Sequence, residues 1–392
     1  MQQYLSNVLR SLVDEGMAVG MSAMVTVNGK EIFKDCCGCA DLDTKAPFAY
    51  DTICRIYSMT KIVTAVAAMI LYERGMFRLE DPVKAYLPGF RDTRLLWPRG
   101  DGTFKTVPTR QSARMRHLLT MTVGLPYYGR NTPMEMQYNY HMADLMKRMN
   151  ADTDRGQSWN LQRFANELGA VPMLYEPGTG WSYGLSADIL GAVIEVISGM
   201  SLGEFFRREI FEPLGMTDTG FVVPPEKAGR KAVVYDHTGG TVKPYVNEWL
   251  PTGYTPGLES AGEGLYSTLG DYTRFLQMLA LGGTLDGVRI LGRRTIENMA
   301  TNHVPPSILK DSGAQYFEDD DYGYGFLVSV KTDNTITKCY ETPGSFWWGG
   351  VAGTIARVDP KEKMTTVIMM QHHSAPQPAY VGQIMQTVYA ML

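Results

Sequence analysis

The chain has 392 residues, of which 44% are hydrophobic and 20% charged, and its formal net charge is −4. Because this length exceeds what one small core needs, we expect two lobes or one large domain with an insertion. The slightly acidic balance, without a long basic run, argues against nucleic acid as a partner. No segment approaches the roughly 20 consecutive apolar residues of a membrane-spanning helix, so no membrane partner is expected.

The first segment, "MQQYLSNVLRSLVDEGM", has the spacing of an amphipathic helix. Its apolar residues fall on one helical face: Leu5, Val8, Leu9, Leu12 and Val13. The segment lacks a basic start followed by an apolar core, so a secretory signal is not predicted and we expect a cytoplasmic protein. The next segment, "GMSAMVTVNGKEIFKD", gives two apolar runs joined by Asn28-Gly29, the strongest short signal of a β-hairpin.

The C-terminal part of the chain mirrors this beginning. The stretch "WWGGVAGTIARVDPKEKMTTVIMMQ" contains two apolar runs that meet at residues 359–361, and a last helix is expected over about 378–392. Helix, hairpin, hairpin and helix therefore bracket the chain. We expect the two ends to build one antiparallel sheet faced by helices.

Between these ends the sequence is mostly helical, as in "MRHLLTMT", "DILGAVIEVIS" and "DYTRFLQMLALGG". Segments 92–112, 127–160 and 237–262 are rich in Gly, Pro, Tyr and Trp without clear periodicity, so we interpret them as loops or lids. The predicted fold class is α/β, of the α+β type. A sheet-plus-helix lobe would comprise 1–90 and 225–392, and 91–224 would form a mostly helical lobe with lid loops.

The cysteines do not predict a metal site. A zinc site normally has two separated ligand pairs, and "CCGC" has no second pair to complete it. We therefore interpret the thiols as structural or incidental, and we expect no metal and no cofactor. The cysteines are Cys36, Cys37, Cys39, Cys54 and Cys339.

Residues 55–61, "RIYSMTK", place Ser58 and Lys61 one helical turn apart, ahead of the uncharged run "IVTAVAAMILY". A helix that is apolar all round is a buried helix, and Gly75 supplies a stop. The first-turn N–H groups would favour negative charge developing near Ser58. Burial would lower the pKa of Lys61 and make its amine usable as a base. This is the chemistry of the S-x-x-K motif, which by itself also arises by chance.

The chain resembles the serine β-lactamase-like superfamily, in the branch that includes class C β-lactamases and family VIII carboxylesterases. "TICRIYSMTKIVTAVAAMILYERGMFRLEDPVKAYLP" is similar to its opening signature and "MRHLLTMTVGLPY" to its second landmark. "EPGTGWSYGLSADILGAVIEVISGMSLGEFFRREIFEPLGMTDTGF" and "ESAGEGLYSTLGDYTRFLQMLALGG" resemble the third and fourth. The landmarks occur in the expected order over most of the chain. The resemblance implies an active site between a sheet lobe and a helical lobe.

The resemblance assigns further site residues. Tyr183, in "WSYGLS", occupies the place of the family's Tyr-x-Asn tyrosine. The resemblance implies that it carries the proton to and from the leaving group. Without the resemblance, Tyr183 would be interpreted as a structural tyrosine. Leu185 stands where penicillin-binding relatives carry the asparagine that holds a substrate amide. Trp348-Gly349-Gly350 replaces Lys-Thr-Gly, which is similar to family VIII carboxylesterases. The backbone N–H groups of Ser58 and Val351 form the candidate oxyanion hole.

A second serine motif is a decoy. Residues 199–203, "GMSLG", match the G-x-S-x-G elbow of α/β-hydrolases, but that motif requires a strand before it. Here a helical segment precedes it, and Ser201 with Glu204 forms an S-x-x-E capping box. We therefore predict that Ser201 caps a helix and takes no part in catalysis.

Together these residues predict a serine hydrolase that cleaves carboxylic esters of small molecules through an acyl-enzyme on Ser58. Lys61 and Tyr183 would both titrate below their free pKa values, and the sequence leaves open which of them is the base. Apolar substrate contacts are expected from Trp348, Leu185, Tyr127 and Trp249. A β-lactamase or D-amino-acid peptidase, an acyltransferase of the same fold and a catalytically inactive binding module remain alternatives. An amide substrate and a homo-oligomeric state are also left open.

Overall fold

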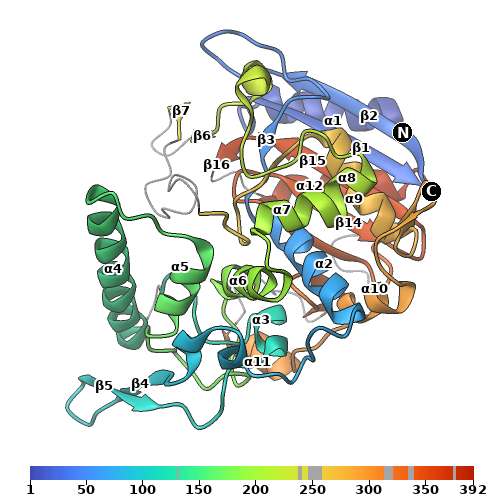
Figure 1. Ribbon diagram of the computed structural model, residues 1–392. Coiled ribbons are helices and arrows are strands. Elements are labelled where there is room, and N and C mark those ends of the chain that lie inside the picture. The colour runs from blue at the N-terminus through green and yellow to red at the C-terminus, as the bar shows by residue number, and fades with distance from the viewer. Residues whose placement is uncertain (130–131, 237–240, 246–257, 313–320, 334–339, 374–376) are drawn as a thin grey trace.

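The computed structural model describes residues 1–392 except 130–131, 237–240, 246–257, 313–320, 334–339 and 374–376 (Figure 1). Trp249 and Cys339 therefore lie outside the described residues.

A seven-stranded antiparallel sheet joins the two ends of the chain, as the hairpin pattern predicts. N-terminal strand β1 lies between C-terminal strand β15 and β2, with Met21 opposite Met370. Asn28 and Gly29, at the β1–β2 turn, have φ angles of +50° and +74°, the backbone that an Asn-Gly hairpin turn needs. In spatial order the strands are β11 (Tyr322–Tyr324), β12 (Ser329–Lys331), β13 (Phe346–Gly349), β14 (Ile355–Asp359), β15 (Met364–Met370), β1 (Gly20–Val27) and β2 (Lys30–Gly38).

Helices cover both faces of this sheet (Figure 1). On one face α1 (Gln2–Asp14) and α12 (Gln377–Tyr389) pack with alternate residues of β1 and β15, such as Val25 and Ile368. On the other face α9 (Leu269–Ala280) packs against β15, β14 and β1. Side chains alternate between the two faces along a strand, and helices cover both faces at β15. Every residue of β15 is therefore buried.

Two helices without a polar face form the centre of the molecule. In α2 (Thr60–Glu73) every residue from Thr60 to Leu71 is buried, and in α6 (Ser186–Ser198) every residue from Ser186 to Glu195 is buried. The two helices pack against each other. A helix that is apolar all round needs such surroundings, which the sequence of α2 predicts.

Two segments expected to be loops contain regular structure. Residues 92–112 form a hairpin of β4 (Arg94–Pro98) and β5 (Phe104–Pro108), and residues 127–160 contain the 22-residue helix α4 (Pro133–Asp154). The interpretation of 127–160 as a loop is wrong because methionine and tyrosine residues spread around α4 and blur its periodicity. Its start was nonetheless encoded, since Thr132 and Glu135 form a capping box before the helix.

The remaining described elements are short. The helices are α3 (Met115–Leu119), α5 (Leu161–Leu168), α7 (Leu202–Phe206), α8 (Glu212–Leu214), α10 (Arg293–Met299) and α11 (Pro306–Ser312). The strands are β3 (Cys54–Arg55), β6 (Tyr235–Asp236), β7 (Lys243–Pro244), β8 (Tyr266–Ser267), β9 (Thr284–Leu285), β10 (Val288–Arg289) and β16 (His372–His373).

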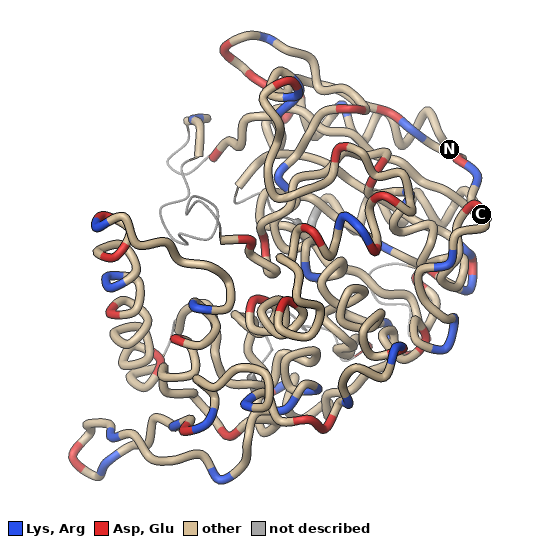
Figure 2. Tube along the Cα trace, viewed as in Figure 1, with Lys and Arg blue, Asp and Glu red and all other residues tan. Residues whose placement is uncertain are grey.

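One hydrophobic core extends from Met24 to Met369 and includes residues of both predicted lobes. The division into 1–90 with 225–392 and 91–224 therefore stays a proposal about how the chain is organised. Acidic and basic residues are interspersed along the trace rather than separated by sign (Figure 2).

Within the described ranges no single helix is both long enough and apolar enough to cross a membrane. The helices Ser186–Ser198 and Leu202–Leu214 satisfy that test only as a pair, which is bent by 78°.

Candidate active site

Ser58 lies in a strained turn at the start of the buried helix α2. Strand β3 leads into a 3₁₀ turn over Tyr57–Met59, and α2 begins at the next residue. Tyr57 has φ = +45°, a left-handed conformation that is uncommon for a residue with a side chain. Tyr57 and Met59 are buried, whereas Ser58 keeps part of its surface exposed. The turn thus presents one hydroxyl from an otherwise buried segment.

The structure brings Ser58, Lys61 and Tyr183 into direct contact. The Tyr183 hydroxyl lies 2.5 Å from Ser58 Oγ, and Lys61 Nζ lies 3.1 Å from the same oxygen. Trp348 Nε1 donates a hydrogen bond of 3.1 Å to the Tyr183 hydroxyl. Two groups able to exchange a proton therefore flank one nucleophilic oxygen, which is the arrangement that covalent catalysis requires.

Lys61 is buried completely and is held by three acceptors. Its Nζ donates to Ser58 Oγ, to the Tyr127 hydroxyl at 2.9 Å and to the Gly262 carbonyl at 2.8 Å. Burial lowers the pKa of Lys61 to about 8, against the opposing effect of the Asp188 and Glu263 charges. A substantial fraction of neutral amine is therefore present in mildly alkaline solution.

Tyr183 differs from the expectation, since its pKa is raised rather than lowered. Burial dominates, and the hydrogen bonds that Tyr183 donates to Ser58 and accepts from Trp348 offset only part of the effect. The prediction of a pKa below the free value rests on the need for a proton acceptor in the site. Desolvation instead disfavours the charged form of each group, and for a phenol that is the deprotonated form. The Tyr183 phenol thus stays protonated at neutral pH. Of the two groups, Lys61 is therefore the better base.

A second layer of residues, which the sequence did not assign, holds Lys61 in place. Asp188 on α6 accepts hydrogen bonds from Ser260 Oγ at 2.7 Å and from the Gly262 N–H at 3.2 Å. The carbonyl of Gly262 in turn accepts from Lys61. Asp188 was recognisable as a charged residue in a helix whose other neighbours are apolar, and Gly262 lies in the fourth family landmark.

Tyr127 lies beside the catalytic groups, and its contact with substrate stays a prediction. Its hydroxyl accepts a hydrogen bond from Lys61 while its ring packs edge-on against Tyr183, with centroids 5.4 Å apart. Its position depends on a bridge between Pro126 and Gly184, which brings two loops together. No local pattern encodes such a contact.

Strand β13, which carries Trp348 and Gly349 and is followed by Gly350, lies beside the nucleophile turn. A Cβ on Gly350 would come within 2.5 Å of the Ile56 carbonyl oxygen, so only glycine permits this approach. Val351 follows in a turn and is exposed. The oxyanion hole of Ser58 and Val351 remains a proposal that this proximity supports.

The predicted substrate contact of Leu185 is wrong, whereas that of Trp348 stays a prediction. Leu185 is 0% exposed and belongs to the core, so its side chain offers no surface to a substrate. Leu185 directly precedes α6 and its side chain packs into the core, and the motif alone does not indicate this orientation. Trp348 is 6% exposed and packs against Tyr183 and Tyr324, with its indole N–H directed at the Tyr183 hydroxyl.

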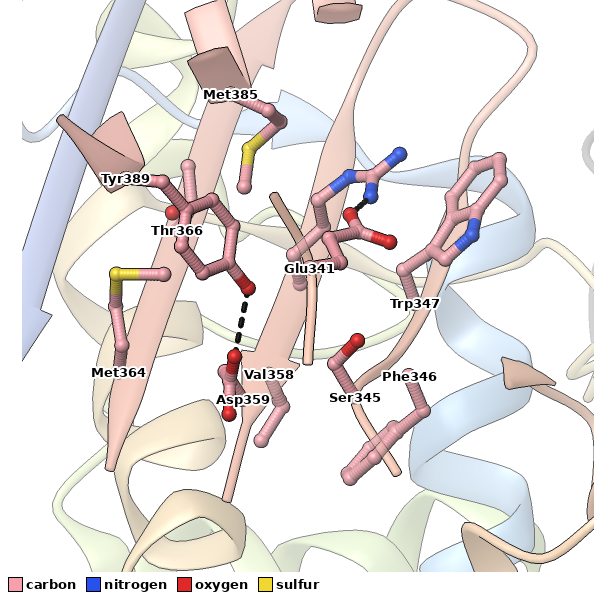
Figure 3. Close-up of a pocket in the computed structure, with 11 residues that line it drawn as sticks. Glu341, Ser345, Phe346, Trp347, Val358, Asp359, Met364, Thr366, Met385 and Tyr389 are labelled. Atoms are coloured by element: carbon pink, nitrogen blue, oxygen red, sulfur yellow. Dashed lines mark hydrogen bonds and ion pairs between the residues drawn. The ribbon is translucent and has the colours of Figure 1, made fainter. Parts of the chain in front are cut away.

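Another polar region lies outside this site. A cavity of about 10 Å³ between β13, β14 and α12 contains the Glu341–Arg357 ion pair and the Asp359–Tyr389 hydrogen bond (Figure 3). Such a volume holds roughly one water molecule, so it cannot be a substrate site.

Over the described part of the chain, no group of His, Cys, Asp or Glu residues could hold a metal ion.

The decoy serine has the predicted role. Ser201 is the N-cap of α7, and its side chain accepts a hydrogen bond from the N–H of Glu204. It follows helix α6 rather than a strand, so the local structure is not a hydrolase elbow.

The fold and the Ser58–Lys61–Tyr183 cluster define the class of serine enzymes built on the β-lactamase fold. The family described as Beta-lactamase matches residues 6–383, so the chain belongs to that family, and the predicted fold and enzyme class are confirmed. Protein Rv1367c of Mycobacterium tuberculosis is 30% identical over 369 residues, covering 93% of this chain and 88% of that protein. Esterase EstB of Burkholderia gladioli is 29% identical, with coverage of 89% and 85%.

Solved structures show the same fold over nearly the whole chain. EstCE1, described as a hydrolase with promiscuous acyltransferase activity, superposes with a TM-score of 0.79 at 25% identity and covers 98% of both chains. Simvastatin synthase (LovD) from Aspergillus terreus has a TM-score of 0.82 at 21% identity, covering 99% of this chain and 98% of that one. The second likeness concerns the fold alone.

Proposed function

We propose that this protein is a serine hydrolase that cleaves carboxylic esters of small molecules through an acyl-enzyme on Ser58. The observation that carries the proposal is that Ser58 Oγ lies within hydrogen-bond distance of both Lys61 Nζ and the Tyr183 hydroxyl. Its similarity to esterase EstB, over 89% of this chain, supports an ester as the substrate class.

In the first half-reaction Ser58 Oγ attacks the ester carbonyl and its proton passes to the neutral amine of Lys61. The oxyanion that forms is held by the N–H groups of Ser58 and Val351. The tetrahedral intermediate then breaks its bond to the alkoxide, which takes a proton from Tyr183 and leaves as the alcohol. Lys61 re-protonates Tyr183, so both groups return to their starting state.

In the second half-reaction water attacks the acyl-enzyme and gives its proton to the same pair of groups. Ser58 leaves with that proton and the carboxylic acid is released. An ester linkage between Ser58 and the acyl group is thus formed and broken once per turnover. Removal of Ser58 Oγ should therefore end turnover.

Trp348 supports an ester rather than a penicillin as substrate. In penicillin-recognising members of the family a lysine at this place pairs with the substrate carboxylate. An indole cannot supply that charge, and a charged group left unpaired in a dry site costs more than the 1–3 kcal/mol or so typical of a neutral polar group. A neutral ester carries no such carboxylate.

Acyl transfer is a second candidate function. EstCE1 is described as having promiscuous acyltransferase activity, and a curated relative from Aspergillus terreus that is 26% identical is named monacolin J acid methylbutanoyltransferase. In this case an alcohol replaces water as the acceptor of the acyl group. The same Ser58 intermediate serves both reactions.

One experiment tests the proposal and separates these candidates. The purified protein is treated with a fluorophosphonate or with benzylpenicillin and the adduct is located by peptide mass spectrometry. We expect fluorophosphonate on Ser58 and little penicillin adduct. Turnover of p-nitrophenyl butyrate with and without an added alcohol then gives the share of acyl transfer. Absence of both labelling and turnover would overturn the proposal.

A cytoplasmic location and a homo-oligomeric state remain part of the proposal. Cell fractionation and light scattering of the purified protein would test them.

A further inference from the structure

A large cavity begins at Tyr127 and runs along helix α4. Its volume is about 810 Å³, within the roughly 300–1,000 Å³ range of small-molecule sites. Among the described residues its walls come from two loop tyrosines and one helix: Tyr127, Tyr128, Asn139, Met142, Ala143, Met146, Lys147, Asn150, Ala151 and Asp154. Figure 1 shows α4 at the margin of the helical part, with α5 beside it.

The α4 residues that line the cavity form one stripe of the helix. They recur at steps of three and four positions from Asn139 to Asp154, which is the spacing of one helical face. At a rise of 1.5 Å per residue this stripe is about 22 Å long. A neighbouring stripe, represented by Tyr138, Leu145 and Met149, is buried in the core, so α4 is fixed by one face and offers another to the cavity.

The cavity is connected to the candidate active site through Tyr127. The hydroxyl of Tyr127 accepts a hydrogen bond from Lys61 Nζ, while the same residue lines the cavity. Helix α4 and the Tyr127 loop are tied together, because Tyr138 donates to the Pro126 carbonyl at 2.6 Å and Asn139 bonds both the N–H and the carbonyl of Gly129. The cavity wall and the catalytic groups therefore hold a fixed relative position.

The chemistry of the lining changes across the stripe. Met142 is buried, and Met146 and Ala151 are half-buried, so the inner part of the wall is apolar and, with its methionines, adaptable in shape. Lys147, Asn150 and Asp154 are exposed and place polar groups at the rim. An extended apolar group with a solvated or polar end fits this gradient, whereas an acetyl group fills only a small part of the volume.

We propose that the α4 cavity binds the larger part of the ester, so that the preferred substrates are esters with an extended apolar acyl or alcohol group. This inference rests on the proposed function, because it takes Ser58 as the site of attack. It goes beyond that function by naming α4 as the element that selects the substrate.

The test fills the cavity without touching the catalytic groups. Ala143→Trp and, separately, Asn150→Trp place a large ring in the stripe; both residues are exposed, so both variants are expected to fold, and either one alone is enough for the test. Asp144→Trp is the matched control, since its side chain is 71% exposed and it does not line the cavity. The probes are p-nitrophenyl acetate, p-nitrophenyl octanoate and octyl acetate.

For at least one of the two long esters, we expect the cavity variants to lower kcat/KM about tenfold or more, a loss of the size that pocket-volume changes produce. Turnover of p-nitrophenyl acetate should stay within about twofold of the wild type, and Asp144→Trp should change none of the three, as is usual for surface substitutions. An equal response of long and short esters in a folded cavity variant would overturn the cavity proposal alone. A wild-type protein that turns over none of the probes would overturn the esterase proposal and with it this inference.

Discussion

Asp188 on α6 accepts a hydrogen bond from the backbone N–H of Gly262, 74 residues further along the chain. The carbonyl of Gly262 accepts a hydrogen bond from Lys61, so the backbone of Gly262 links a buried carboxylate to the candidate base. Asp188 also lies close enough to raise the pKa of Lys61, in opposition to the effect of burial. Burial, which lowers the pKa of Lys61, and the charges of Asp188 and Glu263, which raise it, thus set the protonation of Lys61.

Asp188→Asn should move the pH–rate profile. The amide oxygen can still accept from Ser260 and Gly262, but the negative charge is gone, so the pKa of Lys61 falls further. We expect the rise of kcat/KM with pH to occur at lower pH than in the wild type. Hydrogen bonds to a charged group are worth about 1.5–3 kcal/mol, so some loss of unfolding free energy should accompany the shift.

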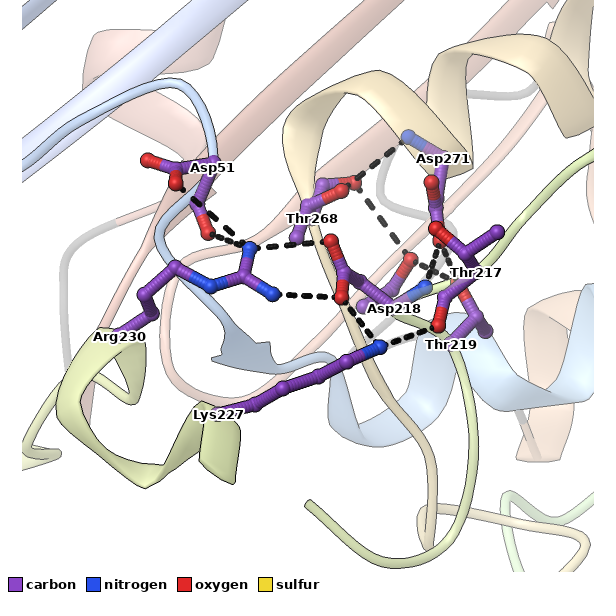
Figure 4. A network of polar contacts seen from close by, with 9 residues as sticks. Asp51, Thr217, Asp218, Thr219, Lys227, Arg230, Thr268 and Asp271 are labelled. Carbon is purple, nitrogen blue, oxygen red and sulfur yellow. Dashed lines mark hydrogen bonds and ion pairs between the residues drawn. The ribbon is translucent and has the colours of Figure 1, made fainter. Parts of the chain in front are cut away.

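Asp271→Asn is the matched control for this prediction. Asp271 is also a buried carboxylate that accepts from a backbone N–H, of Asp218 at 2.7 Å, and from a hydroxyl, of Thr219 at 2.9 Å (Figure 4). It is not among the charges that act on Lys61. The variant should lose stability while its pH–rate profile stays in place. Identical profiles for Asp188→Asn and the wild type would remove Asp188 from the control of Lys61.

Ser58→Ala should abolish fluorophosphonate labelling and lower ester turnover by at least about three orders of magnitude, as loss of a nucleophile does. Ser58 is only half-buried, so the thermal midpoint should change little. Activity is measured with p-nitrophenyl butyrate and folding by circular dichroism. Wild-type turnover in a folded Ser58→Ala protein would refute the assignment of the nucleophile.

Ser201→Ala distinguishes the two serine motifs. The substitution removes the N-cap of α7 and should cost about 1 kcal/mol of unfolding free energy. Its kcat/KM should match the wild type, because Ser201 caps a helix. Chemical denaturation measures the first effect and ester hydrolysis the second. A folded but inactive Ser201→Ala protein would contradict the capping role.

The rate should rise with pH as Lys61 loses its proton. Burial lowers the pKa of Lys61 to about 8, so the neutral amine that accepts the Ser58 proton is scarce at pH 6 and predominates above pH 8. The pKa of Tyr183 is raised, so its phenol remains a proton donor over this range. A plateau on the alkaline side is expected for kcat/KM. A rate that falls between pH 6 and 8 would require Lys61 to act as an ammonium ion.

Tyr183→Phe should lower ester turnover and retain fluorophosphonate access to Ser58. The phenol that protonates the leaving alkoxide is lost, and general acid catalysis of this kind is typically worth about two to four orders of magnitude. Trp348 also loses the acceptor of its indole N–H, so some loss of unfolding free energy should accompany the change. Steady-state kinetics across the pH range provide the measurement. An unchanged rate and profile would exclude Tyr183 from the mechanism.

Ester should be preferred over penicillin on the same preparation. A penicillin carboxylate would lie at Trp348 without a cationic partner, and a penalty of about 3 kcal/mol corresponds to more than a hundredfold in rate. The comparison is kcat/KM for p-nitrophenyl butyrate against benzylpenicillin. Leu185 does not add to this preference by contact, since it is buried. Equal values would show that Trp348 does not set specificity.

The sequence by itself determined the features that depend on local spacing. One helical turn separates Ser58 from Lys61, and a charge-free helix must be buried, so a hydroxyl and an amine in a dry site follow from residues 55–72 alone. Asn28-Gly29 likewise specifies its hairpin because few residues adopt two consecutive positive φ angles. The cap at Ser201 is local as well.

Only the tertiary structure decided which distant groups meet these residues. Tyr127, Asp188 and Gly262 reach Lys61 through loop pairing and helix packing, which no local pattern encodes. The raised pKa of Tyr183 also depends on the packed site, because desolvation of the phenol outweighs its hydrogen bonds with Ser58 and Trp348. Helix α4 carries its apolar residues on more than one face because it packs on the core and also lines a cavity, and this double role hides its period in the sequence.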